Sequence, residues 1–145
     1  MCVRTPSYFP HRRPLRQILG YESGEVMRDS ALPLLPTLLE NYDVLVYNGV
    51  DDALLPPSTG EALARACNWS GAAEFAKAPR SIWRVDDADK EIAGWGRQVG
   101  HTGADGDEKI FALVALRGAG HLVPFDQPRR ALDMLERWIN HAGWE

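Results

Sequence analysis

The sequence holds few cysteines and no long apolar run. Its two cysteines, Cys2 and Cys67, lie far apart and have the spacing of neither a metal site nor a redox motif. No apolar stretch approaches the ~18 residues that a membrane span requires. Positive charge is not in excess, because 16 basic and 20 acidic residues give a net charge of −4. We therefore expect no nucleic-acid partner and no membrane insertion.

Acidic residues are absent from the first 20 positions, which instead hold four arginines and three prolines. This stretch lacks the 7–15-residue apolar core of a secretory signal. We predict a basic, poorly ordered leader over residues 1–20 and one folded unit over residues 21–145. The chain as a whole is 45% apolar and 25% charged, which is the composition of a globular domain.

Short apolar runs alternate with amphipathic segments, which indicates an α/β fold. The run Asp43–Tyr47 predicts a strand buried on both faces, as in a parallel sheet, and Lys109–Leu116 predicts a second buried strand. Between them, residues 81–85 and 92–99 predict two strands of a hairpin with an acidic tip, followed by a polar loop over residues 100–108.

Three helices are expected around these strands. The first follows a cap at Asp29 or Ser30, and the second begins at Ser58, where Ser58-Thr59-Gly60-Glu61 is a capping-box pattern. The third begins at Pro128 after a cap at Asp126 or Gln127, and one face of it carries Leu132, Leu135, Trp138 and Ile139. We expect that face to be the packed one. Trp69 and Phe75 are predicted to anchor the core.

Residues suited to proton transfer follow both predicted buried strands. Asp51 and Asp52 come just after the first strand, and His121 follows the second in Gly118-Ala119-Gly120-His121. Loops at the carboxyl ends of parallel strands converge where α/β enzymes place catalytic groups. A carboxylate beside one imidazole nitrogen fixes the tautomer and stabilises the imidazolium. The structural alternative is that the aspartates form turns and the histidine is held in a glycine-rich loop.

The order aspartate then histidine matches the last two members of the Ser, Asp, His order in α/β hydrolases. The serine of such a triad lies in a Gly-x-Ser-x-Gly elbow, and none of the six serines in this sequence has glycine two positions before and after it. The early strands and the glycine-rich oxyanion loop are not found either. Cys67 falls within a predicted helix beside apolar residues, where a thiol is usually inert.

Two stretches resemble the aspartate and histidine motifs of the serine carboxypeptidases. They are Val44-Leu45-Val46-Tyr47-Asn48-Gly49-Val50-Asp51-Asp52 and Gly118-Ala119-Gly120-His121-Leu122-Val123-Pro124-Phe125-Asp126-Gln127-Pro128. Asn68-Trp69-Ser70-Gly71 with Phe75 is similar to the family's segment between them. The resemblance runs from about Tyr21 to the C-terminus. It implies the C-terminal part of an α/β-hydrolase sheet with flanking helices, incomplete without the N-terminal part.

The resemblance also implies roles for individual residues. Asp52 corresponds to the triad aspartate, with Asp51 as the alternative, and His121 corresponds to the triad histidine. Leu122 stands where the family usually has a methionine that borders the substrate pocket. We expect a carboxylate oxygen of Asp52 within roughly 3.5 Å of a ring nitrogen of His121. The implied activity is removal of C-terminal residues from peptides through an acyl-enzyme, with no metal or cofactor.

Further expectations concern partners and location. The N-terminal carboxypeptidase segment or chain is the expected partner besides the peptide substrate, and the chain alone is expected to be inactive. At least one apolar edge or face of the sheet should be uncovered without that partner. The family resemblance implies the secretory route, to lysosome, vacuole or the outside. The competing hypothesis is a non-catalytic binding or interaction module that keeps the carboxypeptidase scaffold.

Overall fold

A computed structural model describes residues 32–86 and 90–144 of the chain. The leader predicted over residues 1–20, Cys2 and the predicted caps Asp29 and Ser30 lie outside these residues. Within them, none of the helices is both long and apolar enough to cross a membrane. In chain order the elements are η1 (Leu32–Leu34), α2 (Leu35–Asn41), β1 (Val44–Gly49), α3 (Pro57–Ala66), α4 (Ala72–Lys77), β2 (Ser81–Trp83), β3 (Gly94–Thr102), β4 (Glu108–Leu116), α5 (Val123–Asp126) and α6 (Pro128–Ile139).

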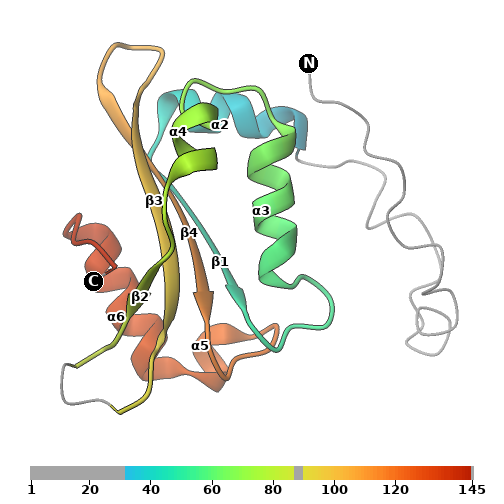
Figure 1. Ribbon diagram of the computed structural model, residues 1–145, viewed down its shortest axis with the longest axis vertical. Helices are drawn as coiled ribbons and strands as arrows, with labels where there is room; N and C mark the ends of the chain where they lie inside the picture. The colour runs from blue at the N-terminus through green and yellow to red at the C-terminus, as the bar shows by residue number, and fades with distance from the viewer. Residues whose placement is uncertain (1–31, 87–89, 145) are drawn as a thin grey trace, which may run out of the picture.

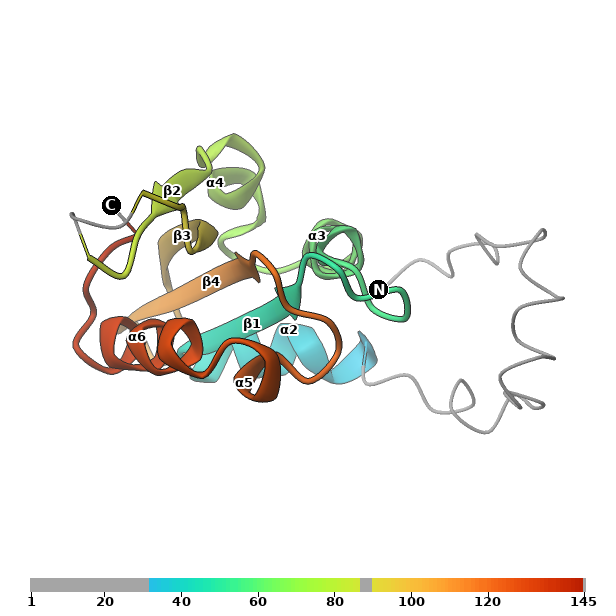
Figure 2. The same cartoon turned by 90° about the horizontal axis from the view of Figure 1, so that it is seen from below.

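The strands form one mixed sheet in the order β1-β4-β3-β2 (Figure 1). β1 runs parallel to β4, with Val44 opposite Phe111 at one end and Gly49 opposite Leu116 at the other. β3 lies antiparallel to both β4 and β2. Helices α5 and α6 lie on one side of the sheet, and α3 and α4 lie on the other (Figure 2). The sheet with its flanking helices agrees with the predicted α/β class.

β4 is the centre of the molecule, because all six residues from Phe111 to Leu116 are buried. Its even-numbered side chains pack with those of α5 and α6, and Phe111 and Leu113 pack with those of α2 to α4. β1 differs from the prediction of burial on both faces, since Tyr47 is exposed and Val44 to Val46 are only half-buried. The reason is that β1 lies at the edge of the sheet that these residues form.

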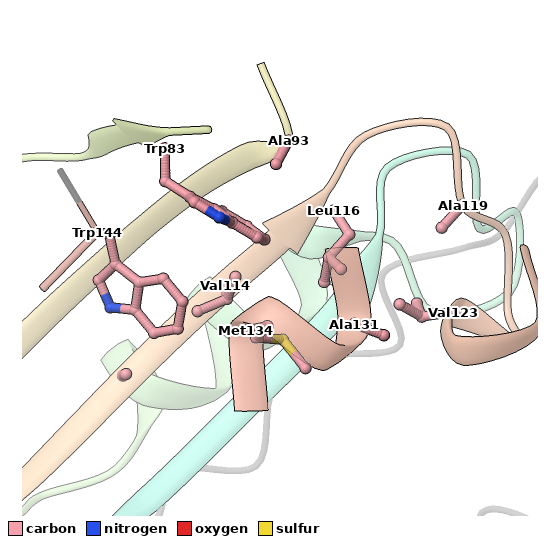
Figure 3. Close-up of a cluster of buried hydrophobic side chains, with 10 residues drawn as sticks. Trp83, Ala93, Val114, Leu116, Ala119, Val123, Ala131, Met134 and Trp144 are labelled. Carbon is pink, nitrogen blue, oxygen red and sulfur yellow. The ribbon is translucent and has the colours of Figure 1, made fainter. Parts of the chain in front are cut away.

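A cluster of buried side chains joins α6 to the sheet (Figure 3). Met134 of α6 packs in this cluster with Val114 of β4, and Trp83 lies edge-on to Trp144 with ring centroids 5.5 Å apart. The indole N–H of Trp83 donates to the carboxylate of Asp133 at 2.6 Å, which gives this buried polar group a partner.

The opposite face of the sheet holds a second core cluster. Trp69 and Phe75 are buried there, as predicted, and both rings pack against Phe111 of β4. The ring of Trp69 also lies edge-on to His101, whose Nε2 donates to the carbonyl oxygen of Leu39 at 2.7 Å. Aromatic side chains from α4, from β4 and from the loop between α3 and α4 thereby pack the helices on this side against the sheet.

Several local predictions differ from the structure. α3 begins at Pro57 rather than Ser58, and no side chain caps it, so the predicted capping box does not form. The polar loop predicted over residues 100–108 is shorter, because β3 continues to Thr102 and β4 begins at Glu108. Pairing of Gly100 with Ile110 and of the next two residue pairs extends the antiparallel ladder into that loop.

The packed face of α6 also differs from the prediction. Ala131 and Met134 are buried, whereas Leu132, Leu135 and Ile139 are 58%, 43% and 70% exposed. We call these three exposed residues the outer stripe. Only Trp138 of the predicted face packs against the core. The packed face is therefore displaced by about one residue around the helix.

Candidate catalytic site

The ends of β1 and β4 bring two loops into direct contact. The N–H of Val50 donates to the carbonyl of Leu116, and the N–H of Asp51 donates to the carbonyl of Ala119, both at 2.9 Å. Gly49 makes this approach feasible, since a Cβ there would lie 2.2 Å from the carbonyl oxygens of Ala119 and Gly120. The loop after each strand is thereby fixed to the loop after the other.

The loop that carries His121 is held by α5 and the residue after it. Gly118 adopts a φ of 70°, a left-handed conformation that favours glycine. Its carbonyl accepts a hydrogen bond from the side chain of Gln127 at 2.8 Å. The N–H of Gly120 donates to Asp126 at 2.7 Å, so this carboxylate ties the histidine loop to α5. The predicted side-chain cap of α6 by Asp126 or Gln127 does not form.

The expected contact between aspartate and histidine is present. Nδ1 of His121 lies 2.9 Å from Oδ2 of Asp52, across 69 positions of sequence. A carboxylate only accepts hydrogen bonds, so Nδ1 carries the proton. The partner of His121 is therefore Asp52, whereas the neighbouring Asp51 is exposed. The structure brings together two of the three predicted site residues.

Asp52 is buried at 7% exposure, and its second oxygen is also occupied. Oδ1 accepts the backbone N–H groups of Leu54 at 2.7 Å and Leu55 at 3.0 Å. Burial by itself would raise the pKa of Asp52, but hydrogen bonds from Leu55, His121 and Leu54 outweigh burial and lower that pKa. Asp52 is therefore an anion at neutral pH. The two backbone N–H donors were not predicted from the sequence, because their positions depend on backbone conformation rather than on residue type.

His121 offers its other nitrogen to solvent. Its side chain is 54% exposed, and with Nδ1 bound to Asp52 the lone pair of Nε2 is the basic position. Leu122, the third predicted site residue, is 64% exposed. Such an arrangement can take a proton from a hydroxyl that approaches Nε2.

Among the described residues, no hydrogen bond joins His121 to a serine, threonine or cysteine. Cys67 is buried in the core cluster on the α3 side. The described residues contain no group of three or more His, Cys, Asp or Glu side chains placed to hold a metal ion. In the described part of the chain, the contact between His121 and Asp52 is thus not extended by a hydroxyl or thiol group.

Comparison with known proteins identifies the family. The model of the serine carboxypeptidase family matches residues 15–141. The probable serine carboxypeptidase CPVL of Homo sapiens is 37% identical over 116 residues, which are 80% of this chain and 22% of that protein. The protein of the same name from Dictyostelium discoideum is 38% identical over 112 residues, covering 77% of this chain and 21% of the relative.

A more distant relative gives the same result. The venom serine carboxypeptidase of Apis mellifera is 31% identical over 129 residues, which are 89% of this chain and 25% of that protein. The chain therefore spans about a fifth to a quarter of the length of these relatives. Since the family model covers most of its residues, the chain belongs to the serine carboxypeptidase family.

Proposed function

We propose that this chain forms the part of a serine carboxypeptidase that supplies the aspartate and histidine of the catalytic triad. The observation that carries the proposal is the 2.9 Å contact between Asp52 and His121 at the ends of two neighbouring parallel strands. The proposal extends to the fold, with β1 and β4 as two strands of a larger α/β-hydrolase sheet. We also propose that residues 1–20 form a basic leader and that residues 21–145 form the carboxypeptidase segment.

In the proposed reaction, a serine hydroxyl from sequence outside these 145 residues gives its proton to Nε2 of His121. The serine oxygen attacks the carbonyl of the last peptide bond, and His121 then passes the proton to the departing amino acid. Asp52 stabilises the imidazolium that forms in between. Water hydrolyses the acyl-enzyme in the same way. None of these steps uses a metal or cofactor, and Leu122 borders the substrate side chain.

The arrangement of the sheet supports a partner for β1. Within the described residues, β1 pairs with no strand other than β4, so the other edge of β1 offers its backbone groups to a further strand. Large apolar side chains within β1 and in the segments before and after it are exposed, namely Leu38, Tyr42, Tyr47, Leu54 and Leu55. We propose the N-terminal carboxypeptidase portion as the partner, in the same polypeptide or as a second chain. The proposed location is the secretory route of the family.

The test is reconstitution. The purified chain is incubated with a blocked dipeptide that ends in a hydrophobic residue, first alone and then with the N-terminal portion of a serine carboxypeptidase. We expect no hydrolysis by the chain alone, because loss of the nucleophile in a triad lowers kcat by about 10⁶. Activity should appear with the added portion. Turnover by the chain alone would contradict the proposal.

Two neighbouring aspartates provide a matched pair of variants for the reconstituted enzyme. Asp52→Asn should lower kcat by about 10⁴, the effect of an amide in place of a triad carboxylate. Asp51→Asn should leave kcat within about twofold, since Asp51 is exposed and does not contact His121. Equal effects of the two variants would contradict the assignment. Peptide binding without turnover in every mixture would favour the non-catalytic module.

A further inference from the structure

A second polar site lies on the α3 side of the sheet, apart from the aspartate–histidine pair. A cavity of about 300 Å³ opens between the start of α3 and the strands β3 and β4. Trp95 and Arg97 of β3 line it, together with Glu61 of α3 and Arg80 from the loop before β2. Asp52, His121 and Leu122 do not line this cavity. The proposed roles of Asp52, His121 and Leu122 therefore leave these cavity groups unassigned.

The charged groups at the cavity are unbalanced. Glu61 lies within ion-pair distance of three arginines, at 2.7 Å from Arg80 and at 3.6 Å from both Arg65 and Arg97. Burial alone would raise the pKa of Glu61, but the arginines lower it, so Glu61 is an anion at neutral pH. Of these arginines only Arg80 and Arg97 line the cavity with Glu61, which leaves one positive charge in excess there. This excess favours an additional anion.

Arg97 is the least satisfied of the three arginines. Its side chain is only 12% exposed, and its buried Nε has no hydrogen-bond partner in the described part of the chain. Nη1 of Arg97 donates a hydrogen bond to the carbonyl oxygen of Phe75, but this bond is long, at 3.4 Å. Arg80, by contrast, is 53% exposed and donates two hydrogen bonds to Glu61. A buried guanidinium with so few acceptors is destabilising unless an acceptor is added.

Apart from Ser58, the remaining residues that line the cavity are apolar. Leu113 and Ala115 of β4 form part of the cavity, together with Val50, Pro57 and the indole of Trp95. Such a wall suits the hydrocarbon part of a ligand, and the arginines suit its charged end.

We propose that this cavity binds a small organic carboxylate, with the carboxylate between Arg97 and Arg80 and an apolar or aromatic group against Trp95. The carboxylate belongs either to a free small acid or to an acidic side chain of an adjoining protein segment. In both cases a planar anion accepts hydrogen bonds from the guanidinium groups, as carboxylates do in bidentate arginine pairs.

Phenylacetate is the probe for the free acid. The 145-residue chain is titrated with phenylacetate and, separately, with phenylacetamide, which has the same shape and no charge. We expect a dissociation constant of about 1 mM or tighter for phenylacetate, in the range for a ligand of this size. The amide should bind at least about tenfold more weakly. Equal binding of the two compounds, or binding of neither, would overturn the proposal.

Variants test whether the arginines that line the cavity, rather than positive charge nearby, bind phenylacetate. Arg97→Met and Arg80→Gln should each weaken phenylacetate binding at least about tenfold. Arg65→Gln is the matched control, because Arg65 contacts Glu61 but does not line the cavity, and it should change the affinity by less than about twofold. Glu61→Gln removes the competing carboxylate and should tighten binding. Circular dichroism checks that each variant folds. If Arg97→Met does not fold, Arg80→Gln still tests the proposal, because Arg80 is exposed and its replacement should not disturb the fold.

The two sources of the carboxylate are distinguished with a peptide mimic. Acetyl-Phe-Asp-amide carries an acidic side chain beside an aromatic group and has no terminal carboxylate. Tighter binding of this peptide than of phenylacetate assigns the cavity to an acidic side chain of an adjoining segment. Tighter binding of phenylacetate assigns it to a free acid. Weakening of phenylacetate binding by Arg65→Gln as large as by Arg80→Gln would overturn the cavity as the site.

Discussion

Asp52 remains charged although it is almost fully buried. Three donors account for this, since one oxygen accepts two backbone N–H groups and the other accepts the imidazole of His121. The backbone donors do not titrate, so they stabilise the carboxylate whether or not His121 carries an additional proton. The aspartate can therefore keep its orientation while the histidine gains and loses a proton.

The lowered pKa of Asp52 predicts a loss of stability in acid. An aspartate whose pKa is lower in the folded than in the unfolded chain stabilises the fold above its unfolded pKa of about 3.9, and this contribution disappears as the pH falls through the folded pKa. The free energy of unfolding should thus fall between about pH 5 and pH 2. Urea unfolding at about pH 7, 5 and 3 measures it.

Asparagine variants provide the control for this prediction. Asp52→Asn cannot titrate and should lose less stability between about pH 5 and pH 3 than the native chain does. Asp51→Asn should follow the native chain, because the side chain of Asp51 is exposed. The same acid loss in the native chain and in Asp52→Asn would show that other carboxylates, such as Glu61, dominate.

The sequence locates the candidate site better than it identifies its contacts. Strand periodicity places Asp51, Asp52 and His121 at two strand ends, and the structure brings those ends together. The choice between the two aspartates came from the family resemblance, because both have the same side chain. The turn after β1 exposes Asp51 and buries Asp52, and backbone conformation of this kind is not evident from residue types. The donors from Leu54 and Leu55 are hidden for the same reason.

At the scale of elements, strands were predicted well and helix faces less well. β4 contains the continuous apolar run 110–116, and in a run of this kind the side chains on both faces of the strand can be buried. α6 is apolar on two sides, with Ala131 and Met134 on one and the outer stripe on the other. The periodicity of apolar residues in the sequence is the same for both sides of the helix, and Ala131 adds little to it because its side chain is small. Only the packing against β4 shows which side faces this sheet.

The contact between the two loops depends on Gly49. In Gly49→Ala the added methyl would meet the carbonyl oxygens of Ala119 and Gly120, so the loops would have to separate. We expect a loss of about 1–3 kcal/mol in the free energy of unfolding, which is typical of overpacking. Denaturant titration measures the loss.

A second glycine serves as the control for Gly49. A Cβ at Gly143 would meet no described atom within 4 Å, so Gly143→Ala should change the free energy of unfolding by less than about 0.5 kcal/mol. A Gly49→Ala chain as stable as Gly143→Ala would mean that the loops are free to part. In that case the contact between Asp52 and His121 would not depend on the fixed strand ends.

The whole molecule exposes apolar side chains on two sides. One set belongs to β1 and to the segments before and after it, and the other comprises the outer stripe of α6 and Phe125 of α5, which is 82% exposed. Large exposed apolar side chains in such numbers favour association with another surface. We therefore expect the isolated chain to self-associate and to bind a hydrophobic dye. A stable monomer in sedimentation that binds no dye would contradict this expectation.

A charge in the outer stripe should reduce that association. Leu132→Glu places a carboxylate on the exposed side of α6 and should lower the mean mass in sedimentation, with a change in unfolding free energy of about 0.5 kcal/mol or less. Ala73→Glu adds the same charge at an exposed position of α4 and should leave the mass unchanged. Equal effects of both variants would indicate that net charge, rather than the stripe, controls association.

The position of β1 at the edge of the sheet also sets an order of assembly. β3 and β4 pair residues as close in sequence as Thr102 and Glu108, whereas the pairing of β1 with β4 joins distant parts of the chain, such as Val44 and Phe111. Local pairings form faster than distant ones, so we expect β1 to join last in folding and to open first. Amide hydrogens of β1 should then exchange with solvent sooner than those of β4. Asp52 and His121 would come together in the final step of folding and separate in the first step of unfolding.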